Sequence, residues 1–178
     1  NINTFHAFCN EIIQKYPEEF PRIIGASNAS RVAQIKILEQ IITDQDNNLK
    51  LKILRPYGAP FYYLPSILSE IERLKKDNIT VSDYQKSVKD ETEEKNKEQE
   101  LALVYREYEE KLREQNLYDF ADMIMEVLSV LKKKKSFLRK LQEEFLYILA
   151  DEHQDANQSQ NELLALLANF HQSPNLFI

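Results

Sequence analysis

Apolar residues recur at helical spacing along most of this chain, which predicts a mainly α-helical fold. Helices are predicted over residues 4–16, 30–43, 66–76, 119–131 and 157–169, and a further one is marked by Leu101, Tyr105, Tyr108 and Leu112. The apolar face of the first helix consists of Phe5, Phe8, Ile12 and Ile13. That of the second consists of Val32, Ile35, Leu38 and Ile42. Thr80 is a predicted helix N-cap.

The pattern changes near the carboxyl end. Residues 145–150 are continuously apolar and predict a buried strand, the helix over 157–169 follows, and residues 175–178 begin a second strand. A strand, a helix and a strand at this spacing predict a right-handed crossover, and therefore a small parallel β portion. Asp151 and Glu152 directly follow the first strand. Both carboxylates are therefore expected at the carboxyl edge of a parallel sheet, where nucleotide sites form.

Two segments interrupt the helical pattern. Residues 55–65 hold three prolines and a glycine, which predict an irregular connector. We expect its aromatic residues to form a small core beneath the loop, and a surface for base stacking is the alternative. These residues are Tyr57, Phe61, Tyr62 and Tyr63. Residues 90–100 are nearly all charged or polar and predict a solvated helix or a flexible joint.

The composition narrows the class of protein. A formal net charge of −6 argues against a general electrostatic grip on nucleic acid but is compatible with a local basic surface. Cys9 is the only cysteine, which excludes an internal disulfide and fits a cytoplasmic location. No apolar run approaches the roughly 20 residues that cross a bilayer, so we expect no membrane partner. Because the first residue is Asn1, we expect the chain to be cut from a longer protein.

The chain has two glycines, Gly25 and Gly58, and contains no GxxxxGK[ST] element. That element supplies the backbone amides and the lysine that grip nucleotide phosphates. The chain alone therefore lacks the main ATP-gripping element. The lysines at 132–135 could contact a nucleic-acid backbone. We favour a solvated helix end instead, because positive charge suits the carboxyl terminus of a helix.

Several segments, in order, resemble motifs of one protein family. Residues 147–160, YILADEHQDANQSQ, resemble motif II, the Walker B segment, of the UvrD/PcrA/Rep-like superfamily-one DNA helicases, whose usual form is DExQDT. Residues 4–9, TFHAFC, resemble the family's TFHSFC-type motif. Residues 104–108, VYREY, and 116–123, NLYDFADM, resemble the family's sequence just before motif II.

This resemblance implies a RecA-like P-loop NTPase α/β domain that carries a helical insertion. Residues 1–19 and 116–178 would be motor-domain segments, and residues 20–115 would be the inserted helical subdomain. The chain is expected to be part of an ATP-dependent DNA helicase that couples ATP hydrolysis to single-stranded DNA translocation and duplex unwinding. Its expected partners are single-stranded DNA, a junction of single strand and duplex, and the other motor domain of the same chain.

Phosphoryl transfer to water needs a metal ion that neutralises the phosphate oxygens and a group that orients the nucleophile. By the resemblance, Asp151 is expected to hold the Mg²⁺ that accompanies ATP, and Glu152 to be the catalytic base. Gln154 is expected to sense the γ-phosphate or to link the site to DNA-binding motifs. Asp155 is expected to orient its neighbours and to cap the following helix.

At the amino end, Thr4 and His6 are expected to contact DNA, because a hydroxyl and an imidazole at a helix start can hydrogen-bond a phosphate. The alternative is that Thr4 only caps its helix. Motif II departs from the family at Ala156, which replaces the usual Thr.

His153 occupies a position where the family often has an aromatic residue. If the segment were extended, Asp151, His153 and Asp155 would alternate onto one face and could present a transition-metal site, although the sequence offers no second ligand cluster.

Two other functions fit the same residues. The chain could be a helical protein-interaction domain in which residues 151–155 form only a turn at the end of a strand. It could also be a relative that binds DNA without hydrolysing ATP. In every case the isolated chain is expected to be inactive, because it lacks the Walker A lysine.

Overall fold

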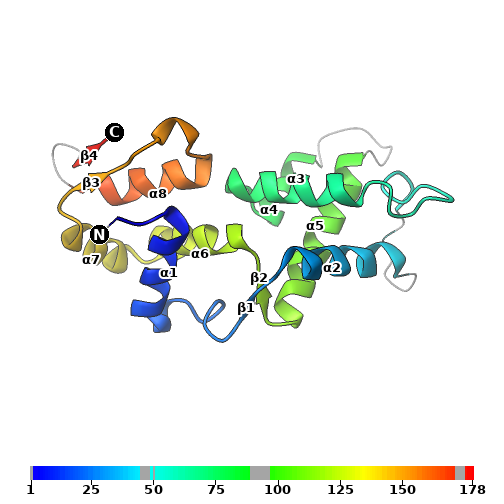
Figure 1. Ribbon diagram of the computed structural model, residues 1–178, viewed down its shortest axis with the longest axis horizontal. Helices are drawn as coiled ribbons and strands as arrows, with labels where there is room; N and C mark the ends of the chain where they lie inside the picture. The colour runs from blue at the N-terminus through cyan, green and yellow to red at the C-terminus, as the bar shows by residue number, and fades with distance from the viewer. Residues whose placement is uncertain (1, 45–48, 50, 89–96, 171–174) are drawn as a thin grey trace. The chain divides into compact units, whose positions relative to one another are not determined.

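The computed structural model describes residues 2–44, 49, 51–88, 97–170 and 175–178. They form the helices and short strands labelled in Figure 1, which divide into two compact units. Unit 1 combines Asn1–Gly25, Lys76–Asn78 and Phe120–Ile178, and unit 2 combines Ala26–Lys75 and Ile79–Asp119. The prediction of a mainly α fold with a small parallel β portion is confirmed.

Unit 1 is built on helix α6, which packs against the other three helices that the described residues of this unit form. These helices are α1 (Phe5–Lys15), α6 (Phe120–Lys133), α7 (Lys135–Glu144) and α8 (Gln158–Ala168). Two short 3₁₀ turns, η1 (Pro17–Glu19) and η2 (His153–Asp155), belong to the same unit. Its fully buried apolar side chains include those of Cys9, Ile13, Phe20, Val127 and Leu131. Burying such a side chain stabilises the fold by about 1.5–3 kcal/mol, so this core holds α1 and α6 together.

The strands of unit 1, β3 (Ile148–Leu149) and β4 (Leu176–Phe177), pair in parallel with α8 between them in the chain. This confirms the predicted order of strand, helix and strand. The prediction of a buried strand over residues 145–150 is wrong, because the pairing covers two residues and Leu149 is 79% exposed. In the described part of the chain β3 has β4 as its one neighbour. A strand is buried only where layers cover both faces of its sheet.

Unit 2 contains four helices and a second parallel pair of strands among its described residues. They are β1 (Ser27–Asn28), α2 (Arg31–Thr43), α3 (Leu64–Lys76, whose last residue belongs to unit 1), α4 (Val81–Val88), α5 (Lys97–Glu114) and β2 (Leu117–Tyr118). One apolar core joins α2, α3 and α5. Its fully buried side chains include those of Leu38, Ile71, Val104, Tyr108 and Leu112.

Three helices begin where hydroxyl residues predict them. The first N–H groups of a helix have no partner within it, so a side-chain oxygen that accepts one of them stabilises the start. Thr4 accepts the N–H of Ala7 at 3.2 Å, and Ser30 accepts the N–H of Ala33 at 3.3 Å. Thr80 in the same way accepts the N–H of Asp83 at 3.2 Å, at the start of α4.

The inward face of α2 differs from the predicted stripe. Val32 is 62% exposed, whereas Ile37, Leu38, Ile41 and Ile42 are buried. Apolar residues are so dense in this helix that its periodicity allows more than one apolar face. Packing onto the core of unit 2 decides which face is buried.

The expected solvated segment over 90–100 is only partly open to comparison, because residues 89–96 lie outside the described residues. Residues 97–100 open helix α5, and Glu100 has no exposed surface. The expectation of solvation is therefore wrong for Glu100, because backbone amides replace the water around its carboxylate.

The expected small core beneath residues 55–65 is also wrong for most of its aromatic residues. Tyr57, Phe61 and Tyr62 are exposed, and Tyr63 alone packs partly against the core of unit 2. Within the described ranges, no helix has the length and apolar character needed to cross a membrane.

Candidate functional site

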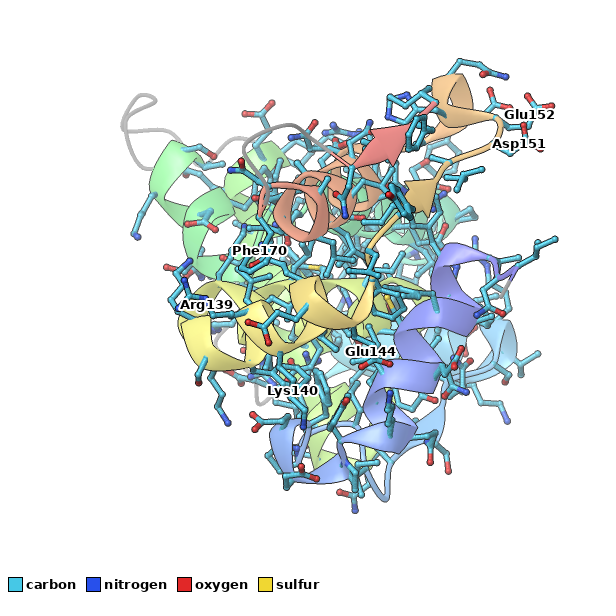
Figure 2. All side chains as sticks on the ribbon, turned by 90° about the vertical axis from the view of Figure 1, so that its left-hand side faces the viewer. Arg139, Lys140, Glu144, Asp151, Glu152 and Phe170 are labelled. Carbon is cyan, nitrogen blue, oxygen red and sulfur yellow. The ribbon has the colours of Figure 1, made fainter. Side chains whose placement is uncertain are left out.

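The parallel pairing of β3 with β4 fixes where the acidic pair emerges from the sheet. Ile148 donates its N–H to the carbonyl of Asn175 at 2.9 Å, and Ala150 donates to the carbonyl of Phe177 at 2.9 Å. The hydrogen-bonded strand ends there, and Asp151 and Glu152 follow at once. Figure 2 shows both carboxylates at an outer corner of unit 1, beyond the end of β3. The sequence prediction that they lie at the carboxyl edge of a parallel sheet is therefore confirmed.

The Asn175 side chain anchors the segment that leads into β3. Its amide nitrogen donates to the carbonyls of Phe145 and Leu146 at 3.0 and 2.9 Å. Asn175 is buried, and its amide oxygen meets no donor among the described residues. A buried amide that bonds two successive carbonyls fixes the path of the chain toward Asp151.

Glu152 adopts a left-handed backbone conformation, with φ 51° and ψ 37°. Residues other than glycine rarely adopt this conformation, because Cβ then crowds the following carbonyl. Local hydrogen bonds hold it: the N–H of Glu152 donates to Oδ1 of Asp151 at 2.9 Å, and its carbonyl accepts the N–H of Asp155 at 3.0 Å. This left-handed residue stands directly before the turn η2, as its N-cap.

The side chains of this turn suit a hard cation and an attacking water. Asp151 and Glu152 are both exposed, so neither carboxylate is committed to the core. The second carboxylate oxygen of Asp151 meets no donor in the described part of the chain. The amide nitrogen of Gln154 donates to Oε2 of Glu152. Carboxylate oxygens are the ligands that Mg²⁺ prefers, so Asp151 can hold this ion while Gln154 orients Glu152.

Helix α8 begins at Gln158, three residues after Asp155, and Asn157 caps it. The Asn157 side chain accepts the N–H of Gln160 at 3.0 Å, and the Gln160 side chain accepts the N–H of Asn157 at 3.0 Å. This reciprocal arrangement is a capping box. The prediction that Asp155 caps the helix is therefore wrong. Asp155 lies in the turn η2, two residues before the cap Asn157, and is exposed.

The structure does not support the alternative of a transition-metal site at Asp151, His153 and Asp155. Residues His153–Asp155 form the 3₁₀ turn η2, so the extended segment that would alternate Asp151, His153 and Asp155 is absent there. These three side chains do not form a metal-ligating group within the described residues. Ala156 accepts a hydrogen bond on its carbonyl from the side chain of Asn161 at 3.1 Å, which ties the turn to α8.

Thr4 and His6 lie at the start of α1. Thr4 is exposed and caps the helix through its hydroxyl. His6 is partly buried, and its ring centroid lies 4.7 Å from that of Phe120. Burial lowers the pKa of His6 below its ordinary value and Lys76 lowers it further, while a hydrogen bond with the backbone of Phe120 opposes both effects. A neutral imidazole could still hydrogen-bond a phosphate, so the DNA contacts of both residues stay predictions.

The family model for the UvrD/REP helicase N-terminal domain matches residues 1–178. The chain belongs to this family. This match confirms the resemblance found in the sequence motifs.

Individual proteins similar to this chain are named as DNA helicases. The chain is 30% identical over 161 residues to a probable DNA helicase II homolog of Mycoplasma pneumoniae, a match that covers 90% of this chain and 21% of that protein. It is 31% identical over 165 residues to a probable DNA helicase of the same organism, which covers 90% of this chain and 28% of that protein. It is 27% identical over 159 residues to the ATP-dependent DNA helicase PcrA of Leuconostoc citreum, which covers 89% of this chain and 19% of that protein.

The chain therefore spans between 19% and 28% of the length of these relatives of the UvrD/REP family.

Sequence reasoning missed one feature of unit 1, a cleft of about 750 Å³ whose lining includes Lys135, Arg139, Lys140 and Phe170. The Arg139 guanidinium lies 5.9 Å from the centroid of the Phe170 ring. Figure 2 shows Arg139, Lys140 and Phe170 well apart from Asp151 and Glu152, which do not line the cleft, so the cleft is not part of the acidic site. The sequence signal for the basic lining of this cleft was the pair of basic residues four positions apart, at 135 and 139, which lie on one face of a helix.

Proposed function

We propose that this chain is part of an ATP-dependent DNA helicase and supplies the acidic residues that act on the bound nucleotide. One observation carries the proposal: in a chain of the UvrD/REP family, an exposed Asp–Glu pair follows directly on the carboxyl end of a parallel strand. Nucleotides bind at this edge of open α/β sheets.

Each polar residue of the turn has a proposed role. Asp151 holds Mg²⁺, directly or through water. Glu152 accepts the proton of the attacking water. Gln154, which already donates to Glu152, orients that carboxylate and responds to the γ-phosphate. The bound ion would neutralise charge on the phosphate oxygens.

The other parts of the chain fit a motor with an insertion. We propose motor-domain segments at residues 1–19 and 116–178, with the helical insertion at 20–115. The division into compact units, with changes at Gly25–Ala26 and at Asp119–Phe120, supports this arrangement. Thr4 and His6 would contact single-stranded DNA from the first motor-domain segment. The whole protein would work in the cytoplasm on single strands and at duplex junctions, together with a second motor domain of the same chain.

The 178 residues alone are proposed to be inactive. They contain no GxxxxGK[ST] element, so Mg–ATP would lack its main protein grip. Activity must therefore be measured in the complete helicase that contains this chain.

The test is the Glu152→Gln substitution in that helicase. Glutamine keeps the size of the side chain and the hydrogen bond to Gln154 but is too weak a base to accept the proton. We expect DNA-stimulated phosphate release to fall by about a hundredfold or more, because a positioned general base contributes about 10²–10⁴ in rate. ATP binding, measured with a fluorescent analogue, should be retained.

The matched control is Glu18→Gln, the same substitution at an exposed residue of unit 1 outside the acidic turn. We expect the Glu18→Gln helicase to hydrolyse ATP at close to the unaltered rate. A Glu152→Gln helicase that turns over at the unaltered rate would remove the base assignment. Equal losses in both variants would show that the loss at Glu152 is not specific to a catalytic base.

A further inference from the structure

Residues 51–63, named here the aromatic loop, expose three large rings. Tyr57 is fully exposed, and Tyr62 and Phe61 are 70% and 42% exposed. Figure 1 shows the loop reaching beyond the amino end of α3. Clustered exposed aromatic residues mark interaction sites more often than chance, because their burial on binding is strongly favourable.

The base of the aromatic loop is held in place by one buried carboxylate. Glu100 accepts the N–H groups of Lys52, Ile53 and Leu54 at distances of 2.7 to 3.1 Å. Glu100 and Leu54 are both buried. Hydrogen bonds to an ionised group are roughly twice as strong as neutral ones, so this cluster anchors a segment without regular secondary structure.

Successive turns then fix the outer part of the loop. The N–H of Ala59 donates to the carbonyl of Pro56, and the N–H of Tyr62 donates to the carbonyl of Ala59. Gly58, with φ 79°, supplies the left-handed conformation that the first turn needs. The Tyr62 ring meets the Tyr63 ring edge-on, with centroids 4.8 Å apart. The exposed rings therefore stand on a supported backbone, which lowers the entropic cost of binding.

The charged side chains within the loop itself are all positive. Residues 51–69 contain no aspartate or glutamate, although the whole chain has a net charge of −6. Lys52 and Arg55 lie within the loop, and Nζ of Lys97 lies 4.7 Å from the centroid of the Tyr63 ring. Exposed rings next to cations, without nearby acids in the loop, match the bases and phosphates of a single-stranded nucleic acid.

We propose that the aromatic loop binds single-stranded nucleic acid, with bases stacked on Tyr57 and Tyr62 and with Lys52 and Arg55 facing the phosphates. The inference rests on the proposed helicase function for the identity of the polymer as DNA. It adds a contact surface in unit 2 to the contacts proposed for Thr4 and His6 in unit 1. Base stacking tolerates any sequence, as a translocating motor requires.

The experiment measures binding of the 178-residue chain to a fluorescein-labelled oligothymidylate of about 16 nucleotides by anisotropy. We expect Tyr57→Ala with Tyr62→Ala to weaken binding about tenfold or more, since each stacked base contributes enough for such a loss. Tyr57→Phe with Tyr62→Phe should bind like the unaltered chain, because phenylalanine keeps the stacking face. The control Val32→Ala removes an exposed apolar side chain elsewhere in unit 2 and should change nothing.

Two further readouts identify the contact. An oligonucleotide that carries 2-aminopurine should lose fluorescence on binding the unaltered chain and the phenylalanine pair, but not the alanine pair. Lys52→Gln with Arg55→Gln should reduce the dependence of affinity on salt, measured between about 50 and 200 mM, because fewer counterions are released. Circular dichroism confirms that each variant is folded.

The proposal is overturned if the alanine pair binds as tightly as the unaltered chain, if the phenylalanine pair loses as much affinity as the alanine pair, or if the unaltered chain shows no saturable binding. In the first case the occupant of the loop is something else, such as a protein. Failure of the proposed function would show separately from failure of this proposal. In the complete helicase, the Glu152→Gln variant should still bind the oligonucleotide, and the alanine pair should keep its DNA-independent ATP hydrolysis.

Discussion

At the residue scale, Glu100 replaces water with backbone amides. A buried charge is costly unless hydrogen bonds compensate it, and three consecutive N–H groups at Lys52, Ile53 and Leu54 provide this compensation. The benefit is mutual, because a loop without ladder partners needs acceptors for its own buried N–H groups. The carboxylate therefore does for this loop what a neighbouring strand does in a sheet.

We predict that Glu100→Gln lowers the free energy of unfolding by about 1–3 kcal/mol, because an amide group replaces one accepting oxygen and leaves an N–H unsatisfied. Urea denaturation of the chain measures the loss. Hydrogen exchange at residues 52–54 should accelerate at the same time. Glu98→Gln, an exposed substitution on the same helix, is the control. If both variants were equally stable, the carboxylate would not anchor the loop.

At the element scale, helix α8 connects the acidic turn to the core of unit 1. Its amino end is held by the capping box of Asn157 and Gln160, and its inner face buries Leu163, Leu164 and Leu167. The turn that carries Asp151 and Glu152 therefore lies between a hydrogen-bonded strand end and a capped helix. Both neighbours restrict the path of the turn.

We predict that Asn157→Ala destabilises the chain by about 1 kcal/mol, the usual cost of losing an N-cap. Asn157→Asp keeps the accepting oxygen and should retain the stability of the unaltered chain. Thermal unfolding followed by circular dichroism distinguishes the two variants. An alanine variant as stable as the aspartate variant would mean that packing alone sets the start of α8.

The sequence predicted most helices of this chain, because their apolar positions recur with the helical period and their caps are hydroxyl or amide residues. It missed α7, since Phe137, Leu138 and Leu141 are scattered among lysines and arginine and look like part of a charged segment. The pair β1 and β2 was also missed. Each of these strands has two residues, and their pairing joins positions 27 and 117, which local patterns cannot detect.

The same limits apply to the candidate site. An apolar run that ends in Asp151 and Glu152 was visible in the sequence, and so was the order of strand and helix. The left-handed backbone of Glu152 was not, because it depends on hydrogen bonds from the turn that follows. Nor was the burial of Glu100, which lies at the end of a strongly charged segment and acquires its partners from a loop more than forty residues earlier.

At the scale of the whole molecule, unit 2 interrupts unit 1 in the chain. The strand by which the chain enters unit 2, β1, pairs with the strand by which it leaves, β2. The N–H of Ser27 donates to the carbonyl of Asn116, and the N–H of Ala29 donates to the carbonyl of Tyr118. An insertion whose two ends lie side by side adds little strain to its host, because the host segments need no long connection to span it. The pairing supports the proposed insertion of a helical subdomain into a motor domain.

A buried ion cluster reinforces unit 2 near the exit strand. Nζ of Lys75 lies 2.5 Å from Oδ2 of Asp119, also forms a salt bridge with Glu109, and lies 5.2 Å from the centroid of the Tyr108 ring. All three charged side chains are almost completely buried. The cluster joins α3, α5 and the residue just before α6, which are far apart in the sequence.

We predict that Lys75→Met lowers the free energy of unfolding by about 3–5 kcal/mol, because two buried carboxylates lose the cation between them. Lys86→Met, an exposed lysine substitution on α4, should leave stability nearly unchanged. Denaturant titration of the two variants measures the difference. Equal stabilities would show that the carboxylates are compensated by other groups.

The buried position of Cys9 also has a practical consequence. Burial raises the pKa of its thiol to about 12, and it is the only cysteine of the chain. Thiolate is the form that reacts with maleimides and disulfide reagents, so we expect the folded chain not to react with them. A cysteine introduced at Tyr57 would be the sole reactive thiol and could carry a fluorophore to the aromatic loop without any prior removal of native cysteines. Slow labelling of Cys9 itself would then record each opening of unit 1, in the same tube and by the same reagent.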